Sequence, residues 1–262
     1  MTHTRILYDA CPLCGCQAIT DVGMYDCSSH ELYKPELPTV MNWCECFECR
    51  HMFTDGYFSP ESLAVLFSRT HDNQEPGHDP ERGRRVWSRV VEQVTAFHGA
   101  AAGRWLDVGF GDGTLLFTAQ EWGYEPLGID LRPTSVEKLV ALGVPARAVA
   151  LESLDEPDGF AVISMADVLE HMPFPKQALE CAWKLLAPAG LLFISMPNKD
   201  TVSWRVLERE QRNAYLIEIE HYHNFSRGRL YELLAETGFL PVWYGVSQRY
   251  LCGMEVIARR TT

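Results

Sequence analysis

Two pairs of cysteines near the N-terminus have the spacing of a metal site. Cys11 and Cys14 form one CxxC pair, and Cys46 and Cys49 form a second. Two thiolates separated by a tight turn converge on one ion, and two such turns complete a tetrahedral sulfur shell, the geometry that Zn²⁺ prefers. Because four thiolates leave no open coordination position, the predicted zinc is structural. It would help to fold a segment too small to build its own core.

The other cysteines leave alternatives to this prediction. Nine cysteines are present, and seven of them lie in the first 49 residues. An odd total argues against a disulfide framework. Cys44 could replace Cys46, and the cysteines could also be reduced structural residues without metal. A redox CxxC motif is disfavoured, because no βαβ pattern surrounds either pair.

A second pattern combines glycines with carboxylates. The segment 104–108 is predicted to be a short buried strand, and it leads into Gly109-Phe110-Gly111-Asp112-Gly113. Glycines at every second position allow a turn that a Cβ would block, and they let a ligand approach the backbone at the start of a helix. Asp107 precedes the glycines, and its carboxylate favours a cation or an amine over a pyrophosphate. Asp130 ends the next predicted strand, where an acid accepts both hydroxyls of a ribose.

Ionisable side chains that could act on a second substrate lie further along the chain. His171 follows a predicted strand, and Glu218, Glu220, His221 and His223 form the densest ionisable cluster. An imidazole can hold a proton near neutral pH, so one of these histidines, with Glu220 beside it, is predicted to be the general base. The alternatives are a capping or core role for His171 and a solvated helix face for the residues 218–223.

The elements that position these residues form an open α/β sheet. Helices are expected at 60–67 and 84–98, and the sheet follows with strands at 104–108, 126–130, 160–165 and 191–195, helices at 114–122, 176–186 and 227–237, and an antiparallel pair at 239–246 and 251–258. Alternating strands and helices give right-handed crossovers, which place a ligand outside the carboxyl ends of the strands. Asp107, Gly109, Asp130 and the residues 165–167 all fall at that edge. The polar stretch 199–217 is read as an insertion that could cover the pocket.

The same residues carry a resemblance to a known family. Leu106–Gly113 resembles the first motif of class I S-adenosylmethionine-dependent methyltransferases, and Asp130 stands where their ribose-binding acid lies. The resemblance continues through four later stretches, Asp167–His171, Leu186–Leu192, Met196–Asn198 and Glu220–Ser226. These look like the small-molecule branch that includes quinone-biosynthesis O-methyltransferases. The cysteine pairs resemble the N-terminal zinc module of bacterial sugar and natural-product methyltransferases.

The resemblance implies a fold, two cofactors and their residues. The fold would be a Rossmann-like seven-stranded class I methyltransferase sheet with helices on both faces, plus a small zinc-ribbon module. S-adenosylmethionine would be bound by Asp107, Gly109, Phe110, Gly111, Gly113, Asp130, Leu131, Met165, Ala166 and Asp167. Some quinone methyltransferases bind a divalent metal at a stretch similar to Asp167, Glu170 and His171. The acid that often contacts the adenine has no clear counterpart, and Glu152 is the nearest candidate.

The amino-acid composition excludes some classes of function and location. Lys and Arg total 23 against 35 Asp and Glu, a net charge of −12, which argues against nucleic acid as a partner. No apolar run reaches the roughly 18 residues of a membrane span, and no signal region is recognised, so a cytoplasmic protein is expected. Three parts are expected, with a zinc ribbon at 1–58, connecting helices at 59–102 and a methyltransferase domain at 103–262.

The leading hypothesis is methyl transfer, most directly to oxygen, on a small natural-product, sugar or quinone-like acceptor. One alternative is an rRNA or tRNA base methyltransferase with an N-terminal zinc module. The other is a non-catalytic zinc-ribbon binding protein. The residue pattern does not specify the acceptor, the atom that is methylated or the oligomeric state.

Overall fold

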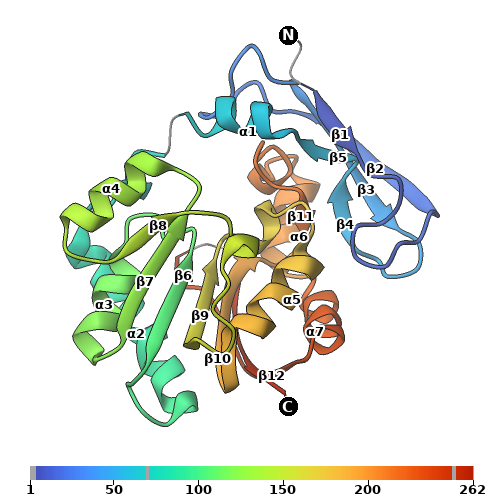
Figure 1. The fold of residues 1–262 in the computed structure, drawn as a ribbon. Helices are drawn as coiled ribbons and strands as arrows, with labels where there is room; N and C mark the ends of the chain where they lie inside the picture. Colours follow the sequence, from blue (N-terminus) through green and yellow to red (C-terminus); the bar gives the residue numbers. More distant parts are fainter. Residues whose placement is uncertain (1–3, 69–70, 250–251, 262) are drawn as a thin grey trace.

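A seven-stranded sheet forms the centre of the computed structural model, which describes residues 4–68, 71–249 and 252–261 (Figure 1). Its spatial order is β12-β13-β10-β9-β6-β7-β8. The strands are β6 (Arg104–Val108), β7 (Glu125–Asp130), β8 (Ala146–Ala148), β9 (Phe160–Ala166), β10 (Leu186–Pro197), β12 (Phe239–Val246) and β13 (Gly253–Arg260). Neighbours from β10 to β8 pair in parallel, whereas β13 is antiparallel to both β10 and β12. The predicted Rossmann-like sheet is confirmed; residue 251, where its last strand was expected to begin, lies outside the described residues.

Helices cover both faces of this sheet. Alternate strand residues such as Trp105 and Phe193 pack with α2 (Pro80–His98), α3 (Thr114–Trp122) and α4 (Pro133–Ala141) on one face. The residues between them, such as Leu106 and Ile194, pack with α5 (Pro175–Leu185) and α7 (Arg227–Glu236) on the other. Because side chains of a strand point alternately to its two faces, strands buried on both sides are apolar almost throughout.

One helix begins earlier than predicted. α2 starts at Pro80 rather than at residue 84, and the side chain of Asp79 accepts a hydrogen bond from the backbone N–H of Arg82. The buried residues of this helix begin at Trp87, so its first two turns carry no apolar periodicity. The cap, rather than the buried face, marks the start of the helix.

The N-terminal segment builds a second, four-stranded antiparallel sheet. It contains β2 (Ile19–Asp26), β3 (Val40–Cys46), β4 (Met52–Thr54) and β11 (His223–Asn224), while β1 (Arg5–Leu7) pairs separately with β5 (Gly56–Phe58). β11 comes from the far end of the chain and pairs with β4. The N-terminal sheet is therefore completed by residues that follow the central strands in sequence.

The core of this second sheet also combines residues from both ends of the chain. α1 (Pro60–Leu66), capped by Ser59, and α6 (Val202–Arg209) belong to this part of the molecule. Trp43 is fully buried with Trp204 and Tyr222, and its indole N–H donates to the carbonyl of Leu216 at 3.0 Å. Across the described ranges, no helix combines the length and the apolar character that crossing a bilayer requires.

Candidate active site and metal centre

A cavity of about 580 Å³ opens at the carboxyl ends of β6, β7 and β9. Asp107, Asp130 and Ala166 line it on the side of the sheet. Eight residues between positions 73 and 87, at the start of α2 and before it, also line the cavity. This is the edge at which open α/β sheets bind their ligands.

The glycine loop shapes one wall of the cavity. Gly109, Gly111 and Gly113 have φ of 64°, 52° and 76°, in the left-handed region. At Gly111 an added Cβ would meet no described atom within 4 Å, so it would stand in open space at the cavity wall. Gly113 does not line the cavity; a Cβ there would lie 2.6 Å from a methyl group of Leu139. Gly111 thus leaves room for a ligand, whereas a Cβ at Gly109 would lie 2.9 Å from a methyl group of Val168, and Gly113 allows α3 and α4 to pack.

Asp107 is a buried carboxyl group that faces the cavity. It is 3% exposed, and its Oδ1 accepts a hydrogen bond from the Ser164 hydroxyl at 2.5 Å. Burial, partly offset by this hydrogen bond, raises the pKa of Asp107 to about 7. A positively charged ligand group would favour the ionised form, which is the predicted role of this residue.

Asp130 ends β7 with both carboxylate oxygens engaged. Oδ1 accepts from the backbone N–H and the Nε–H of Arg132, and Oδ2 accepts from Nη2, each at 2.8 Å. Both residues line the cavity. A ribose bound at Asp130 would therefore have to share these oxygens with the Arg132 guanidinium.

The remaining predicted cofactor residues divide into two groups. Phe110, Leu131, Ala166 and Asp167 line the cavity, whereas Met165 is fully buried and packs in the core beneath it. The segment Val149–Glu152, where the adenine contact was sought, also lines the cavity.

Arg249 is a cavity residue that sequence reasoning missed. Its Nη1 donates to Asp167 Oδ2 at 2.7 Å, and its guanidinium lies 4.3 Å from the centroid of the Trp87 ring. Asp167 also accepts a hydrogen bond from the Ser195 hydroxyl. A single arginine between two strands carries no local sequence signal.

His171 is the predicted base that reaches the cavity wall. Its Nδ1 lies 3.1 Å from the backbone carbonyl oxygen of Glu220. Because a carbonyl oxygen only accepts, Nδ1 carries the proton and Nε2 keeps the lone pair of a neutral imidazole. The side chain of Glu220 lies nearby, with its Oε1 3.9 Å from this Nδ1 and 3.5 Å from His71 Nε2.

The Glu220 carboxylate is held in its charged form. Burial by itself would raise its pKa, but the hydrogen bond from His71 and the proximity of the His171 and His221 rings lower the pKa to about 2. A negative charge beside an imidazole stabilises the imidazolium that forms when the ring takes up a proton.

His221 and His223 are placed differently from the prediction, because neither is among the described residues that line the cavity. His221 packs edge-on against His171 with ring centroids 4.6 Å apart, and burial lowers its pKa to about 3. His223 is fully buried, with Nδ1 3.0 Å from His51 Nε2 and Nε2 2.9 Å from the carbonyl oxygen of Met172. Burial also lowers the pKa of His223 to about 3. The hydrogen bonds of His223 tie the N-terminal sheet to the segment after β9.

In the predicted divalent-metal site, His221 takes the place of Asp167. The ligand atoms of Glu170, His171 and His221 lie within 4.8 Å of one another, whereas Asp167 turns to Arg249 and Ser195. Glu170 is 1% exposed, and neither of its carboxylate oxygens has a hydrogen-bond partner in the described part of the chain. One carboxylate and two imidazoles form a donor set that suits a transition-metal ion.

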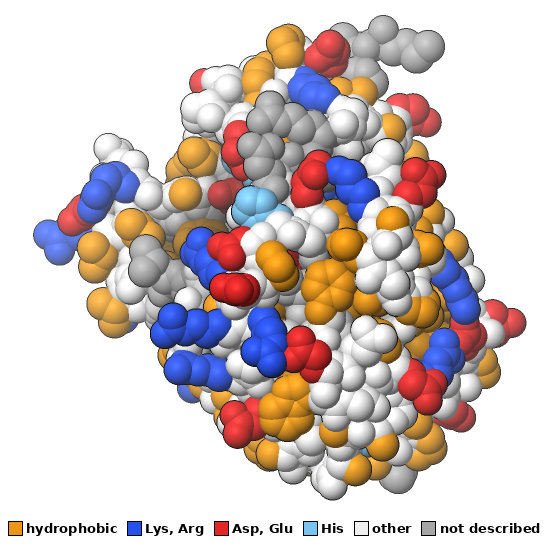
Figure 2. Space-filling view, turned by 90° about the vertical axis from the view of Figure 1, so that its left-hand side faces the viewer, with side chains coloured by type: hydrophobic (Ala, Val, Ile, Leu, Met, Phe, Trp, Pro, Cys, Tyr) orange, Lys and Arg blue, Asp and Glu red, His pale blue; other side chains and the backbone are white. Residues whose placement is uncertain are grey.

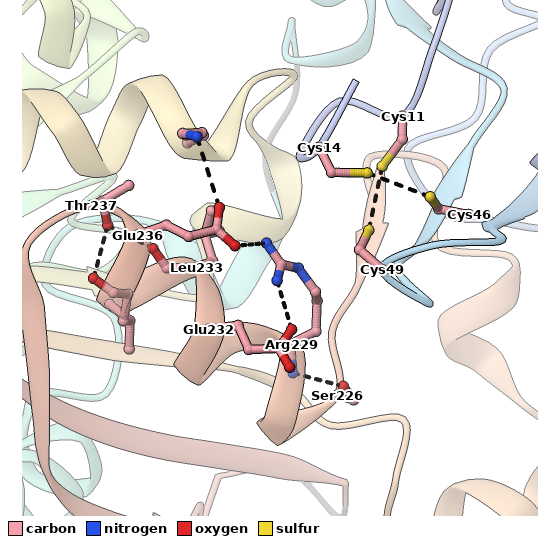
Figure 3. A network of polar contacts seen from close by, with 12 residues as sticks. Cys11, Cys14, Cys46, Cys49, Ser226, Arg229, Glu232, Leu233, Glu236 and Thr237 are labelled. Carbon is pink, nitrogen blue, oxygen red and sulfur yellow. Dashed lines mark hydrogen bonds and ion pairs between the residues drawn. The ribbon is translucent and has the colours of Figure 1, made fainter. Parts of the chain in front are cut away.

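The four cysteines of the two CxxC pairs come together at the edge of the N-terminal sheet (Figure 3). The sulfur atoms of Cys11 and Cys49 are 3.6 Å apart, and those of Cys14 and Cys46 are 3.5 Å apart. With Zn–S bonds of about 2.3 Å, the edge of a tetrahedral sulfur shell is about 3.8 Å. The thiol of Cys44 instead faces Asp21, at 3.7 Å from its Oδ1. The geometry therefore fits a Cys₄ zinc site with Cys46, rather than Cys44, as the ligand.

The stretch 199–217 does not cover the cavity as expected. Trp204 and Leu216 are buried in the core of the N-terminal sheet, and none of the residues 199–217 is among the described residues that line the cavity. α6 is amphipathic, and its buried Trp204 directs it toward that core. Residues before the central strands, between positions 73 and 87, line the cavity instead.

Comparison with known proteins identifies the family. The family described as a methyltransferase domain matches residues 80–242. The ubiquinone biosynthesis O-methyltransferase of Nitrosococcus oceani is 30% identical over 178 residues, which are 61% of this chain and 75% of that protein. The protein of the same name from Idiomarina loihiensis is 36% identical over 107 residues, which are 38% of this chain and only 44% of that protein.

Solved structures share the fold at low identity. A 1,6-didemethyltoxoflavin-N1-methyltransferase of Burkholderia thailandensis, with bound 1,6-didemethyltoxoflavin and S-adenosylhomocysteine, has a TM-score of 0.60 and 20% identity over 83% of this chain and 99% of that chain. An S-adenosylmethionine-dependent methyltransferase of Mesorhizobium loti has a TM-score of 0.53 and 18% identity over 64% of this chain and 96% of that chain. The family match covers more than half of the sequence and includes the glycine loop, Asp107 and Asp130. The chain therefore belongs to the class I S-adenosylmethionine-dependent methyltransferases.

Proposed function

We propose that this protein methylates a hydroxyl group of a small-molecule acceptor, with His171 as the general base. The observation that carries the proposal is one cavity that has Asp107 and Asp130 in one wall and the His171 ring in another. The quinone-biosynthesis relatives are named as O-methyltransferases, which supports oxygen as the acceptor atom and a quinone-like ring as the acceptor class.

The cofactor end of the cavity fits an adenosyl compound. Asp130 has the two oxygens that ribose hydroxyls require, Asp107 suits an amine or a sulfonium, and Gly111 leaves open space at the wall. Leu131 and Glu152 would contact the adenosine part. When bound, S-adenosylmethionine supplies a methyl group activated by its sulfonium.

The acceptor end requires a group that removes a proton. His171 would take the hydroxyl proton on Nε2 while the acceptor oxygen bonds to the methyl group that the sulfonium of S-adenosylmethionine would supply, and S-adenosylhomocysteine would be the leaving group. Glu220 stabilises the resulting imidazolium, and the cavity holds the acceptor in line with the methyl group. The proton then leaves His171 for solvent.

A divalent ion at Glu170, His171 and His221 is a second route to the same reaction. It is favoured by the buried Glu170 carboxylate, which has no hydrogen-bond partner in the described ranges. Such an ion would lower the pKa of an acceptor hydroxyl, and His171 would then be a ligand rather than the base.

The test begins with a screen for S-adenosylhomocysteine release against phenols, sugar nucleotides and carboxylated metabolites. With an acceptor in hand, His171→Ala is expected to lower kcat by about 10²–10⁴-fold with unchanged affinity for S-adenosylmethionine. His98→Ala, at the end of α2 and outside the described cavity wall, is the control. Unchanged turnover in His171→Ala would remove this residue from the mechanism.

The same experiments separate the other hypotheses. Activity that disappears with chelator and returns with a divalent ion supports the metal route. Methylation of RNA fractions alone supports an RNA methyltransferase. Figure 2 shows acidic and basic side chains interspersed on one face, whereas RNA binding favours a continuous basic surface. Cofactor binding without any turnover supports a non-catalytic binding protein.

We also propose that Cys11, Cys14, Cys46 and Cys49 bind one structural zinc ion. The short sulfur–sulfur distances and the absence of a disulfide among the described cysteines support this. Purified protein is expected to contain one zinc per chain by elemental analysis, and Cys46→Ser is expected to lose it. Wild-type protein without zinc would refute the site.

A further inference from the structure

Arg229 of α7 lies beside the cysteine cluster, and one of its three side-chain nitrogens has no hydrogen-bond partner in the described chain. Figure 3 shows its side chain between the carboxylates of its own helix and the four cysteines. Nη1 donates to Glu232 at 2.7 Å and Nη2 donates to Glu236 at 2.8 Å, so the guanidinium is held in one orientation. Its Nε is buried and has no hydrogen-bond partner within the described chain. A buried N–H without an acceptor is costly, and such groups are rare in folded proteins.

A zinc ion bound by the four cysteines would require nearby hydrogen-bond donors or cations. Four thiolates around Zn²⁺ carry a net charge of −2, which is unfavourable in a buried site unless cations or donors compensate it. Cys11 and Cys46 are 3% and 0% exposed, and they belong to the same hydrophobic cluster as Leu230 and Leu233 of α7. The zinc site thus shares one continuous core with the helix that carries Arg229, and the two lie side by side in Figure 3.

Arg229 also interacts electrostatically with one particular cysteine. Burial lowers the pKa of the Arg229 guanidinium, but the hydrogen bonds to Glu236 and Glu232 raise it above its usual value, and Cys49, when ionised, lies near enough to add to this rise. Lys199, another cation near this sheet, has its ammonium group 3.3 Å from Glu45 Oε2. Arg50 is likewise paired with Glu45, at 2.7 Å. These two cations are engaged with Glu45, whereas Arg229 has a donor left over.

We propose that Arg229 is a positioning residue for the zinc centre, with its Nε–H donating a hydrogen bond to the thiolate of Cys49 when zinc is bound. This rests on the zinc site proposed above. A thiolate is a much better acceptor than a neutral thiol, so the contact strengthens when the metal deprotonates the cysteine. Zinc loading therefore stabilises the packing of the N-terminal sheet on α7. The same sheet holds β11, which begins two residues after His221.

The test measures zinc affinity by competition with a chromophoric chelator on the full chain. Arg229→Met is expected to weaken zinc binding about 10- to 100-fold, the usual effect of removing a partner of a metal ligand. Arg227→Met is the matched control, because the Arg227 guanidinium lies on the same helix but over the ring of Tyr244. Its zinc affinity should equal that of the wild type.

A spectroscopic measurement keeps the test informative if Arg229→Met folds poorly. Arg229→Lys retains the positive charge but has no Nε–H. In the Co²⁺-substituted protein, its sulfur-to-cobalt charge-transfer band is expected to shift relative to the wild type, because the thiolate has lost a hydrogen bond. Unchanged zinc affinity in Arg229→Met, or an unshifted band in Arg229→Lys, would overturn the proposal. Wild-type protein that binds no zinc would instead refute the metal site itself.

Discussion

The affinity for S-adenosylmethionine is expected to fall as the pH drops below 7, because of Asp107. Burial raises the pKa of this carboxyl group to about 7, so it is largely ionised at pH 8 and largely protonated at pH 5.5. A cationic ligand requires the ionised form, and binding at low pH must therefore release a proton. Affinity then falls tenfold per pH unit below 7, which amounts to about 30-fold, or about 2 kcal/mol, between pH 8 and pH 5.5.

Isothermal titration calorimetry in buffers of different ionisation enthalpy tests this directly. It measures both the dissociation constant and the number of protons released on binding. The wild type should release about one proton at pH 5.5 and almost none at pH 8. Asp107→Asn has no titrating group at this position, so its affinity should be weaker than that of the wild type at pH 8 and nearly independent of pH.

The same variant has an expected effect on stability. A carboxyl group whose pKa is raised by folding destabilises the folded state as the pH rises through the folded pKa. Ligand-free Asp107→Asn should therefore melt at a higher temperature than the wild type at pH 8, and this advantage should shrink at pH 5.5. An affinity of the wild type that does not change with pH, together with normal binding by Asp107→Asn, would refute the reasoning.

Two further perturbations test the glycine loop and the zinc site. Gly111→Ala is expected to weaken S-adenosylmethionine binding about tenfold or more, because its Cβ would stand at the cavity wall, whereas Gly143→Ala should leave binding unchanged. Both positions have positive φ and no described atom within 4 Å of the added Cβ, so both variants should lose about 1 kcal/mol of stability, measured by urea unfolding. Removing zinc with a strong chelator should lower the melting temperature and expose the N-terminal segment to protease. Restoring zinc should reverse both effects, and a melting curve unaffected by the chelator would contradict a structural role.

Much of the central fold follows from local patterns. The strand 104–108 and the helix 114–122 were expected at the bounds that β6 and α3 have. Clustered apolar residues, and glycines at both ends of the helix, specify such elements within a few positions of the chain. β10 begins at Leu186, five residues before its expected start. Its first residues include Pro188 and Gly190, which are typical of a turn, so the sequence did not predict this part of the strand. The division of the chain at residues 58 and 102 stays a prediction.

The binding residues that stand at a fixed spacing in the chain could also be predicted from the sequence. The glycine loop, Asp107, Asp130 and the two CxxC pairs each derive their arrangement from a turn or from the end of a strand. Such arrangements depend on neighbours in sequence. The residue types and their spacing therefore carried the cofactor and metal predictions.

The choice among the histidines required the tertiary structure. His223 contacts His51, 172 positions away in the sequence, and Arg249 contacts Asp167, 82 positions away. The cluster of Glu170, His171 and His221 likewise forms only when the segment after β9 meets the segment before β11. Burial and protonation depend on the summed surroundings of a side chain, and those surroundings come from segments that no local pattern connects. For that reason the types of the reactive groups could be read from the chain, whereas which of them face the cavity was decided by folding.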